Sequence, residues 1–193
     1  MKTIVVKSKP IAPRSVEKTD KLIVLAWHRE KTVEEFYKKH ELLIDALKSF
    51  ASEVVLEPIS SHGERLYRSV LSILMYHADI NSEVIVELDS EDVVLNTALI
   101  FAALTLPNPA TKIYAESIGS IVVDVEKYRK MLALDSRERE IYIRLLHSAM
   151  DWKTLASTVN IPKSTLYRKL RRLIKNNLVI EKNNKYVAVD VIT

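Results

Sequence analysis

Glycine is scarce in this sequence: only Gly63 and Gly119 occur among 193 residues. An average composition would contain about 7% glycine. Loops of the G-x-G-x-x-G and Walker A types need several glycines close together, because their backbone must approach phosphate groups closely. Neither loop can form here, which excludes the common nucleotide-dependent enzyme classes.

Cysteine is absent, which excludes disulfides, thiol nucleophiles and cysteine-ligated zinc or iron–sulfur sites. The five histidines form no His-x₃-His pair; they are His28, His40, His62, His77 and His147. No grouping of residues in the sequence is typical of catalysis. We therefore expect no catalytic residues, no metal and no cofactor, in a protein that is not an enzyme.

Long hydrophobic runs are also missing. The longest apolar stretch, residues 93–106, is interrupted by Asn96 and Thr97 and is shorter than the roughly 20 residues that span a bilayer. The first ten residues, MKTIVVKSKP, contain too few apolar residues for a signal peptide. Together with the absence of cysteine, these features favour a cytoplasmic protein with no membrane partner.

Charge is distributed unevenly along the chain. Residues 1–124 contain 14 Lys and Arg against 18 Asp and Glu, whereas residues 125–193 contain 15 against 7. An acidic segment followed by a basic one suggests two modules with different partners. The basic module is the candidate for binding nucleic acid.

In the first 124 residues, short runs rich in β-branched residues alternate with helical stretches. The predicted strands are 3–6, 22–27, 54–59, 84–88, 112–115 and 121–125, and the predicted helices are 33–50, 64–78 and 91–106. This alternation is typical of an α/β domain with a parallel sheet covered on both faces. Residues 8–20 contain Pro10 and Pro13 and lack helical periodicity. Either the first crossover is too short for a helix, or the first two strands are not a simple β-α-β pair.

The predicted helix at 91–106 is apolar almost all the way round. Such a helix must be buried on more than the side that faces its sheet. We expect the remaining side to pack against a second copy of the chain, which gives a homodimer. Burial under the C-terminal module is the alternative.

The last 59 residues, 135–193, predict three helices followed by a hairpin. The first helix begins at Asp135 or Ser136, with Glu138 completing a capping box and Leu146 among its inward residues. The second covers about 152–159. Asn160 is expected to take a left-handed conformation in the turn that leads to Pro162 and the third helix.

The third helix, residues 162–177, has leucines on one face and cations on the other. Its outward cations, with no acid on the helix among them, are Lys163, Arg168, Lys169, Arg171, Arg172 and Lys175. Strands at 178–181 and 186–191 are predicted to be joined by a tight turn through Asn183 and Asn184, which favour positive φ.

Three helices and a hairpin in this order make an α+β winged helix-turn-helix, whose third helix fits the major groove of double-stranded DNA. The residues expected to contact DNA are Lys163, Ser164, Thr165, Tyr167, Arg168, Arg171, Arg172 and Lys175 on the helix, and Lys182, Asn183, Asn184 and Lys185 in the hairpin. Basic side chains also suit a second hypothesis, in which the module contacts protein or RNA within a nucleoprotein assembly. The sequence does not separate the two.

The string VIVELDSEDVVLNTALIFAALTL at 84–106, followed by KIYA at 112–115, resembles the core of a CARF domain, the CRISPR-associated Rossmann fold. Asn96-Thr97-Ala98-Leu99 matches the N-x-A-L helix of that family. A CARF-like domain at 1–124, a connector at 125–134 and a winged helix at 135–193 resemble archaeal CRISPR-locus transcriptional regulators. The resemblance implies a Rossmann-like fold, a dimer, and promoter DNA of CRISPR or other antiviral defence genes.

The same resemblance implies a cyclic oligoadenylate ligand, but the loop that would contact its phosphates is Asp89-Ser90-Glu91-Asp92. These carboxylates would repel phosphate, whereas Asp89 or Ser90 would cap the helix that follows. We therefore do not expect a cyclic oligoadenylate to bind or to be cleaved, and we expect a dimerisation scaffold or a sensor of a different signal. A residual ligand site at the strand ends would use Ser8, Lys9, Ser60, Ser61, His62 and Ser90.

Overall fold

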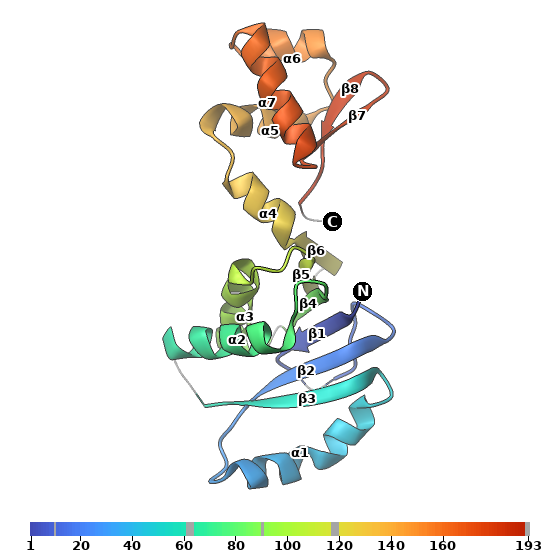
Figure 1. Cartoon of the computed structure of the whole chain (residues 1–193), viewed down its shortest axis with the longest axis vertical. Coiled ribbons are helices and arrows are strands. Elements are labelled where there is room, and N and C mark those ends of the chain that lie inside the picture. Colours follow the sequence, from blue (N-terminus) through green and yellow to red (C-terminus); the bar gives the residue numbers. More distant parts are fainter. Residues whose placement is uncertain (10, 61–63, 90, 117–119, 192–193) are drawn as a thin grey trace. The chain divides into compact units, whose positions relative to one another are not determined.

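The computed structural model describes residues 1–191 except 10, 61–63, 90 and 117–119 (Figure 1). The chain divides into two compact units, Met1–Val125 and Glu126–Thr193. In the described part of the chain, no helix combines the length and the apolar character that crossing a membrane requires.

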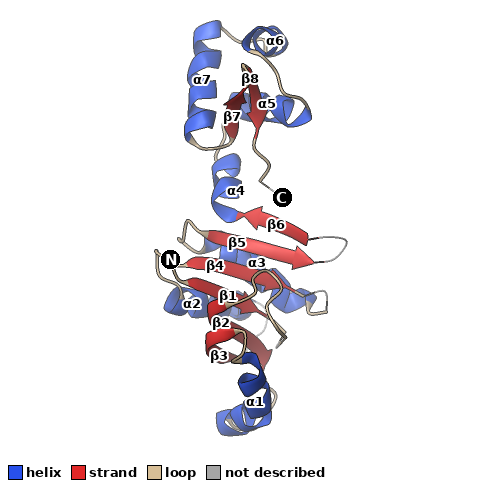
Figure 2. Cartoon of the chain, turned by 90° about the vertical axis from the view of Figure 1, so that its right-hand side faces the viewer, coloured by secondary structure: helices blue, strands red, loops and turns tan. Residues whose placement is uncertain are grey.

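A six-stranded sheet in the order β3-β2-β1-β4-β5-β6 forms the centre of the first unit (Figure 2). Its strands are β1 (Thr3–Lys7), β2 (Thr19–Trp27), β3 (Ala51–Ile59), β4 (Glu83–Leu88), β5 (Thr111–Glu116) and β6 (Ser120–Asp124). The strand order reverses direction between β1 and β4, as in Rossmann-like folds. The predicted α/β sheet is thus present and mostly parallel.

The sixth strand differs from the prediction of an all-parallel sheet, because β6 pairs with β5 in the antiparallel sense. Only residues 117–119 separate these two strands. A parallel connection needs a crossover of a dozen or more residues, so this short link allows only antiparallel pairing.

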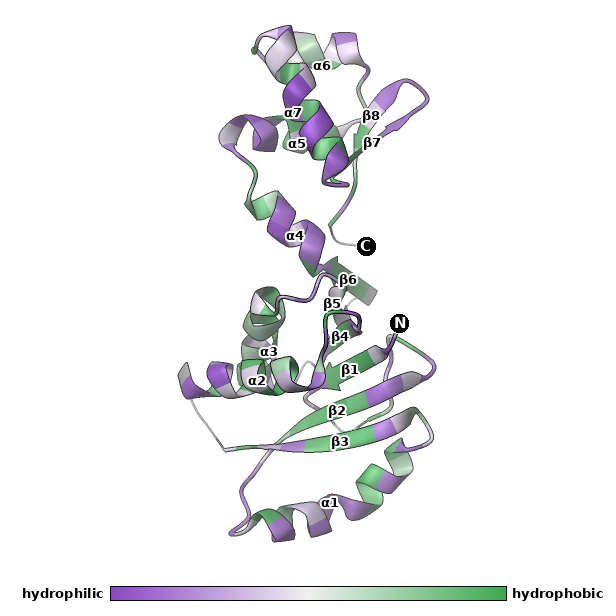
Figure 3. Ribbon diagram, viewed as in Figure 1, coloured by the Kyte–Doolittle hydropathy of each residue, from purple (hydrophilic) through white to green (hydrophobic). Residues whose placement is uncertain are grey.

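Helices cover both faces of the sheet (Figure 1): α1 (Val33–Leu47) lies on one face, and α2 (Glu64–His77) and α3 (Val93–Thr105) lie on the other. Neighbouring residues of a strand point to opposite faces, so Val5 packs in the core beside α1 and Val6 in the core beside α2 and α3. The central strands are accordingly hydrophobic along most of their length (Figure 3).

For the connection between β1 and β2, the sequence left two possibilities: a crossover too short for a helix, or two strands that are not a simple β-α-β pair. The two strands are parallel neighbours, and the described residues of 8–18 contain no helix. This segment is tied to the sheet through Glu87 of β4, whose carboxylate accepts hydrogen bonds from the backbone N–H groups of Arg14 (2.8 Å) and Ser15 (2.7 Å). A buried carboxylate thus anchors an irregular crossover where a helix would otherwise lie.

Helix α3 is buried on its inner side but not all the way round. Its buried residues are Leu95, Ala98, Leu99, Ala102 and Ala103. Val93 is 70% exposed and Phe101 57% exposed, which leaves an apolar outer stripe on this helix within the first unit.

The second unit contains the three helices and the hairpin that the sequence predicts, and the segment expected to be a connector forms a further helix. Its elements are α4 (Val125–Leu132), which begins at the boundary between the units, α5 (Ser136–His147), α6 (Trp152–Thr158), α7 (Lys163–Lys175), β7 (Val179–Lys182) and β8 (Lys185–Ala188). Ile141, Leu145, Leu155 and Leu166 are buried between them, whereas Leu146 is 44% exposed. The prediction that Leu146 faces the core was wrong, because the helix rotation that buries Ile141 and Leu145 turns position 146 outward.

Candidate nucleic-acid interface

Helix α5 starts with the capping box that the sequence predicts. The Asp135 carboxylate accepts a hydrogen bond from the backbone N–H of Glu138 (3.0 Å), and the Glu138 carboxylate accepts one from the backbone N–H of Asp135 (3.2 Å). These reciprocal bonds satisfy backbone donors that the first turn of a helix leaves free. They also place both carboxylates at the start of α5.

Helix α7 is fixed by its inner face and by its C-terminus. Leu166, Leu170 and Leu173 are buried. The helix ends in a Schellman motif, in which Leu178 N–H bonds to the Leu173 carbonyl (3.0 Å) and Asn177 takes a φ of 57°. Since a helix has 3.6 residues per turn, burying these leucines directs a stripe of polar residues away from the core, and α7 alternates between hydrophilic and hydrophobic positions (Figure 3).

We call this outward set, consisting of Ser164, Arg168, Arg171 and Lys175, the central stripe; all four residues are exposed. Among the described residues, no acid lies within ion-pair distance of its three cations or of the exposed Lys163. Cations without acidic partners along a helix that fits the DNA major groove are suited to contact phosphates.

The sequence predicted six outward cations on α7 without acidic partners. On the flank that faces α5, two of them have acidic partners. Lys169 forms ion pairs with Asp135 and, at 3.4 Å, with Glu138. Arg172 Nη1 lies 3.1 Å from Glu138 Oε1, and the Glu138 side chain is completely buried. The hydrogen bond from Lys169 holds the pKa of Asp135 below its usual value and raises the pKa of Lys169. We call these four residues, two acids and two cations, the α5–α7 cluster.

The other flank of α7 is aromatic. The Arg171 guanidinium lies over the Tyr167 ring, 5.5 Å from its centroid, and the Tyr167 ring meets the Trp152 ring edge-on at 6.3 Å. A cation held over an aromatic face loses less freedom when it binds a ligand. Sequence reasoning did not pair these residues, although the i, i+4 spacing of Tyr167 and Arg171 was a usable signal.

The hairpin has the predicted tight turn. Lys182 and Lys185 are cross-strand partners, and between them Asn183 (φ 52°) and Asn184 (φ 58°) are both left-handed, as a two-residue type I′ turn requires. Asn160 is not among the left-handed residues, so that prediction was wrong. The turn before α7 instead contains an Ile161 N–H bond to the Val159 carbonyl (2.7 Å).

Of the residual ligand site predicted in the first unit, only Ser8, Lys9 and Ser60 can be placed. Ser61, His62 and Ser90 lie outside the described residues. Ser60 follows β3, and β2 separates that strand from β1, whereas Ser8 and Lys9 follow β1.

The Ser8 hydroxyl bonds to Asn96 Oδ1 (3.2 Å), which also accepts from the Asp89 N–H (3.3 Å). Asn96 therefore joins the loops after β1 and β4, a role that its motif alone did not predict.

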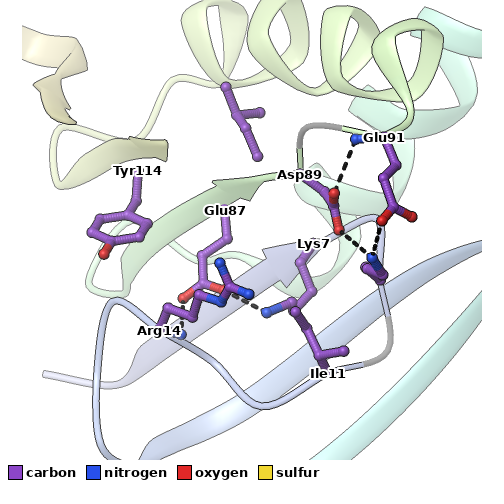
Figure 4. Close-up of a pocket in the computed structure, with 9 residues that line it drawn as sticks. Lys7, Ile11, Arg14, Glu87, Asp89, Glu91 and Tyr114 are labelled. Atoms are coloured by element: carbon purple, nitrogen blue, oxygen red, sulfur yellow. Dashed lines mark hydrogen bonds and ion pairs between the residues drawn. The ribbon is translucent and has the colours of Figure 1, made fainter. Parts of the chain in front are cut away.

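A small cavity of about 140 Å³ lies at the carboxyl ends of β1, β4 and β5 (Figure 4). Its lining residues are Lys7, Lys9, Ile11, Arg14, Glu87, Leu88, Asp89, Glu91 and Tyr114. The lining carboxylates have cationic partners, since Lys7 pairs with Glu87 at 2.6 Å and Lys9 pairs with Glu91 at 2.7 Å and with Asp89 at 3.6 Å.

The cap of α3 also differs from the prediction. Asp92, rather than Asp89, caps the helix, accepting from the Leu95 N–H at 2.9 Å, because α3 starts at Val93. Asp89 accepts from the Glu91 N–H instead, at 3.0 Å. Within the described ranges, no three His, Asp or Glu side chains are grouped so that they could hold a metal ion.

Residues 129–192 match a family model described as "Sugar-specific transcriptional regulator TrmB". The match starts within α4 and extends through β8, and it covers roughly a third of the chain. No curated protein matches the chain. Together with the observed helices and hairpin, the match identifies residues 129–192 as a winged-helix domain of the transcriptional-regulator type.

Proposed function

We propose that the chain is a dimeric, sequence-specific transcriptional regulator that binds double-stranded DNA through its second unit. One observation carries this proposal: the central stripe is exposed and cationic on the third helix of a winged-helix domain, and that domain matches a family model of transcriptional regulators. Such a helix fits the major groove of B-form DNA.

In the proposed complex, the first turns of α7 reach base edges with Lys163, Ser164, Thr165 and Tyr167. Arg168, Arg171 and Lys175 follow along the same helix. Arg171, already held over Tyr167, is suited to a bidentate contact with a guanine. The hairpin turn, with Lys182, Asn183, Asn184 and Lys185, contacts the adjacent backbone as the wing.

The first unit supplies the dimer in this proposal. Val93, Val94 and Phe101 form an exposed apolar stripe on α3, with exposed fractions of 70%, 59% and 57%. Packing two such stripes together removes apolar surface from water, which favours association. A two-fold dimer fixes the spacing of two recognition helices, and hence the spacing of the DNA half-sites.

The CARF resemblance of residues 1–124 supports promoters of CRISPR or other defence genes as targets. We do not assign a cyclic oligoadenylate to this unit, because Asp89 and Glu91 hold Lys9 where a phosphate would need that cation. Thermal-shift titration with cyclic tri-, tetra- and hexa-adenylate tests this part. A saturable rise in melting temperature with any of them would contradict it.

The DNA proposal is tested with the double variant Arg168→Ala/Arg171→Ala, which removes two central-stripe cations. We expect weaker binding to duplex DNA and a salt dependence flattened by about 0.9 in slope per lost phosphate contact. The matched control Lys31→Ala/Lys38→Ala removes the same charge from exposed positions in the first unit. Unchanged affinity in the arginine double variant would refute the placement of α7 on DNA.

A further inference from the structure

We infer that Glu138 is a positioning residue that withholds Arg172 and Lys169 from DNA and thereby selects the stripe of α7 that contacts the duplex. This inference rests on the proposed DNA-binding function and revises the expectation that Arg172 is a DNA contact. It assigns to a buried acid on α5 a role in how α7 recognises DNA.

Both carboxylate oxygens of Glu138 accept hydrogen bonds. Oε1 accepts from Arg172 Nη1 at 3.1 Å and from Lys169 Nζ at 3.4 Å, and Oε2 accepts from the Asp135 N–H at 3.2 Å. The side chain has no exposed surface. A carboxylate removed from water in this way needs cationic partners, because an unpaired buried charge is strongly unfavourable. Arg172 and Lys169 therefore satisfy Glu138.

Charge balance separates the two parts of the outward surface of α7. The α5–α7 cluster contains two acids and two cations and is neutral as a unit. The central stripe carries three cations for which the described residues supply no acid at ion-pair distance. A phosphate near Arg172 or Lys169 would have to compete with carboxylates already in contact, whereas a phosphate near Arg168 would displace only water and counterions.

Salt dependence distinguishes the two kinds of cation. The slope of log K against log salt changes by about 0.9 for each phosphate that a cation neutralises on duplex DNA. We therefore expect Arg168→Gln to flatten the slope by about 0.9 per chain and Arg172→Gln to change it little. Both variants remove one exposed arginine from the same helix, so each is the matched control of the other.

Glu138→Gln provides the complementary test. A glutamine at this position keeps the capping-box hydrogen bond but removes the charge that holds Arg172 and Lys169. We expect a salt slope steeper by about 1 to 2 per chain, tighter binding to a scrambled duplex, and a smaller ratio of specific to scrambled affinity. Adding Arg172→Gln in this background is expected to flatten the slope by about 0.9, unlike in the wild type.

The decisive experiment is a fluorescence-anisotropy titration of a duplex at several salt concentrations with these variants, after circular dichroism has established that each one folds. An Arg172→Gln effect as large as that of Arg168→Gln would overturn the inference. No effect of either variant would instead refute the proposed function. If Glu138→Gln does not fold, the two arginine variants still decide, and a folded Glu138→Gln with an unchanged slope overturns the inference.

Discussion

The Lys7 ammonium donates a hydrogen bond to the Glu87 carboxylate at 2.6 Å, and both side chains are almost completely buried, with 4% and 5% of their surface exposed. The two residues are register partners on β1 and β4, where the strand order reverses direction. The same carboxylate accepts from the backbone of Arg14 and Ser15. One buried ion pair therefore holds the irregular crossover onto the sheet.

Removing the charge of Glu87 is expected to destabilise the first unit strongly. Glu87→Gln leaves the Lys7 ammonium buried without a counter-charge, a change that typically costs about 3–5 kcal/mol. Urea unfolding, followed by Trp27 fluorescence in a Trp152→Phe background, measures the free energy. The control Asp45→Asn removes the exposed partner of the exposed Lys48 and should cost less than about 1 kcal/mol. Equal losses in the two variants would contradict the anchoring role.

The stability of the first unit should fall in acid through the same residue. Burial alone would raise the pKa of Glu87, but hydrogen bonds from Lys7 and Ser15 outweigh it and hold this pKa below 4.5. A carboxylate with a depressed pKa adds stability above its unfolded pKa and loses it as pH falls through the folded pKa. The stability difference between wild type and Glu87→Gln should therefore shrink as pH falls below about 4.5. A difference that stays constant down to pH 3 would contradict this.

A charge on the outer stripe of α3 should prevent dimer formation. Phe101→Glu places a carboxylate where two apolar stripes would meet, and desolvating it without a partner is unfavourable. Native mass spectrometry and light scattering at micromolar concentration should show dimer for the wild type and monomer for the variant. Leu42→Glu, at an exposed apolar position on α1, is the control and should remain dimeric. A monomeric wild type would refute the dimer.

The wing turn should tolerate glycine better than alanine. Asn184 has a φ of 58°, a conformation that asparagine and glycine adopt readily and that costs other residues roughly 1–2 kcal/mol. Asn184→Ala should lower the stability of the second unit by about 1 kcal/mol, and Asn184→Gly by less. Thermal unfolding followed by Trp152 fluorescence in a Trp27→Phe background tests this order. A larger loss for glycine than for alanine would contradict the turn assignment.

The sequence predicted features that depend on neighbouring residues. The capping box at Asp135 and Glu138, the left-handed Asn183 and Asn184, and the inner leucines of α7 follow from local spacing. The contacts of Lys169 and Arg172 with Glu138 did not follow, because they join residues more than thirty positions apart and depend on how α5 packs against α7.

Two errors are local, and one missed role depends on distant residues. Asn160 has the composition of a left-handed turn residue, yet the connection from α6 to α7 does not require positive φ there. Asp89 or Ser90 was expected to cap a helix over 91–106, but α3 starts at Val93, so Asp92 is its cap. The sequence did not predict that Glu87 anchors the crossover, because its partners lie on β1 and in the crossover, 72 to 80 residues earlier in the chain.

The central claim is sequence-specific DNA binding, and one titration tests it most directly. Fluorescence anisotropy with duplexes from upstream of the neighbouring genes and with a scrambled duplex, at two salt concentrations, measures affinity and specificity together. We predict sub-micromolar binding that prefers one fragment at the higher salt. Weak binding that is equal on all fragments and disappears with salt would contradict the claim and favour a module that contacts protein or RNA in an assembly.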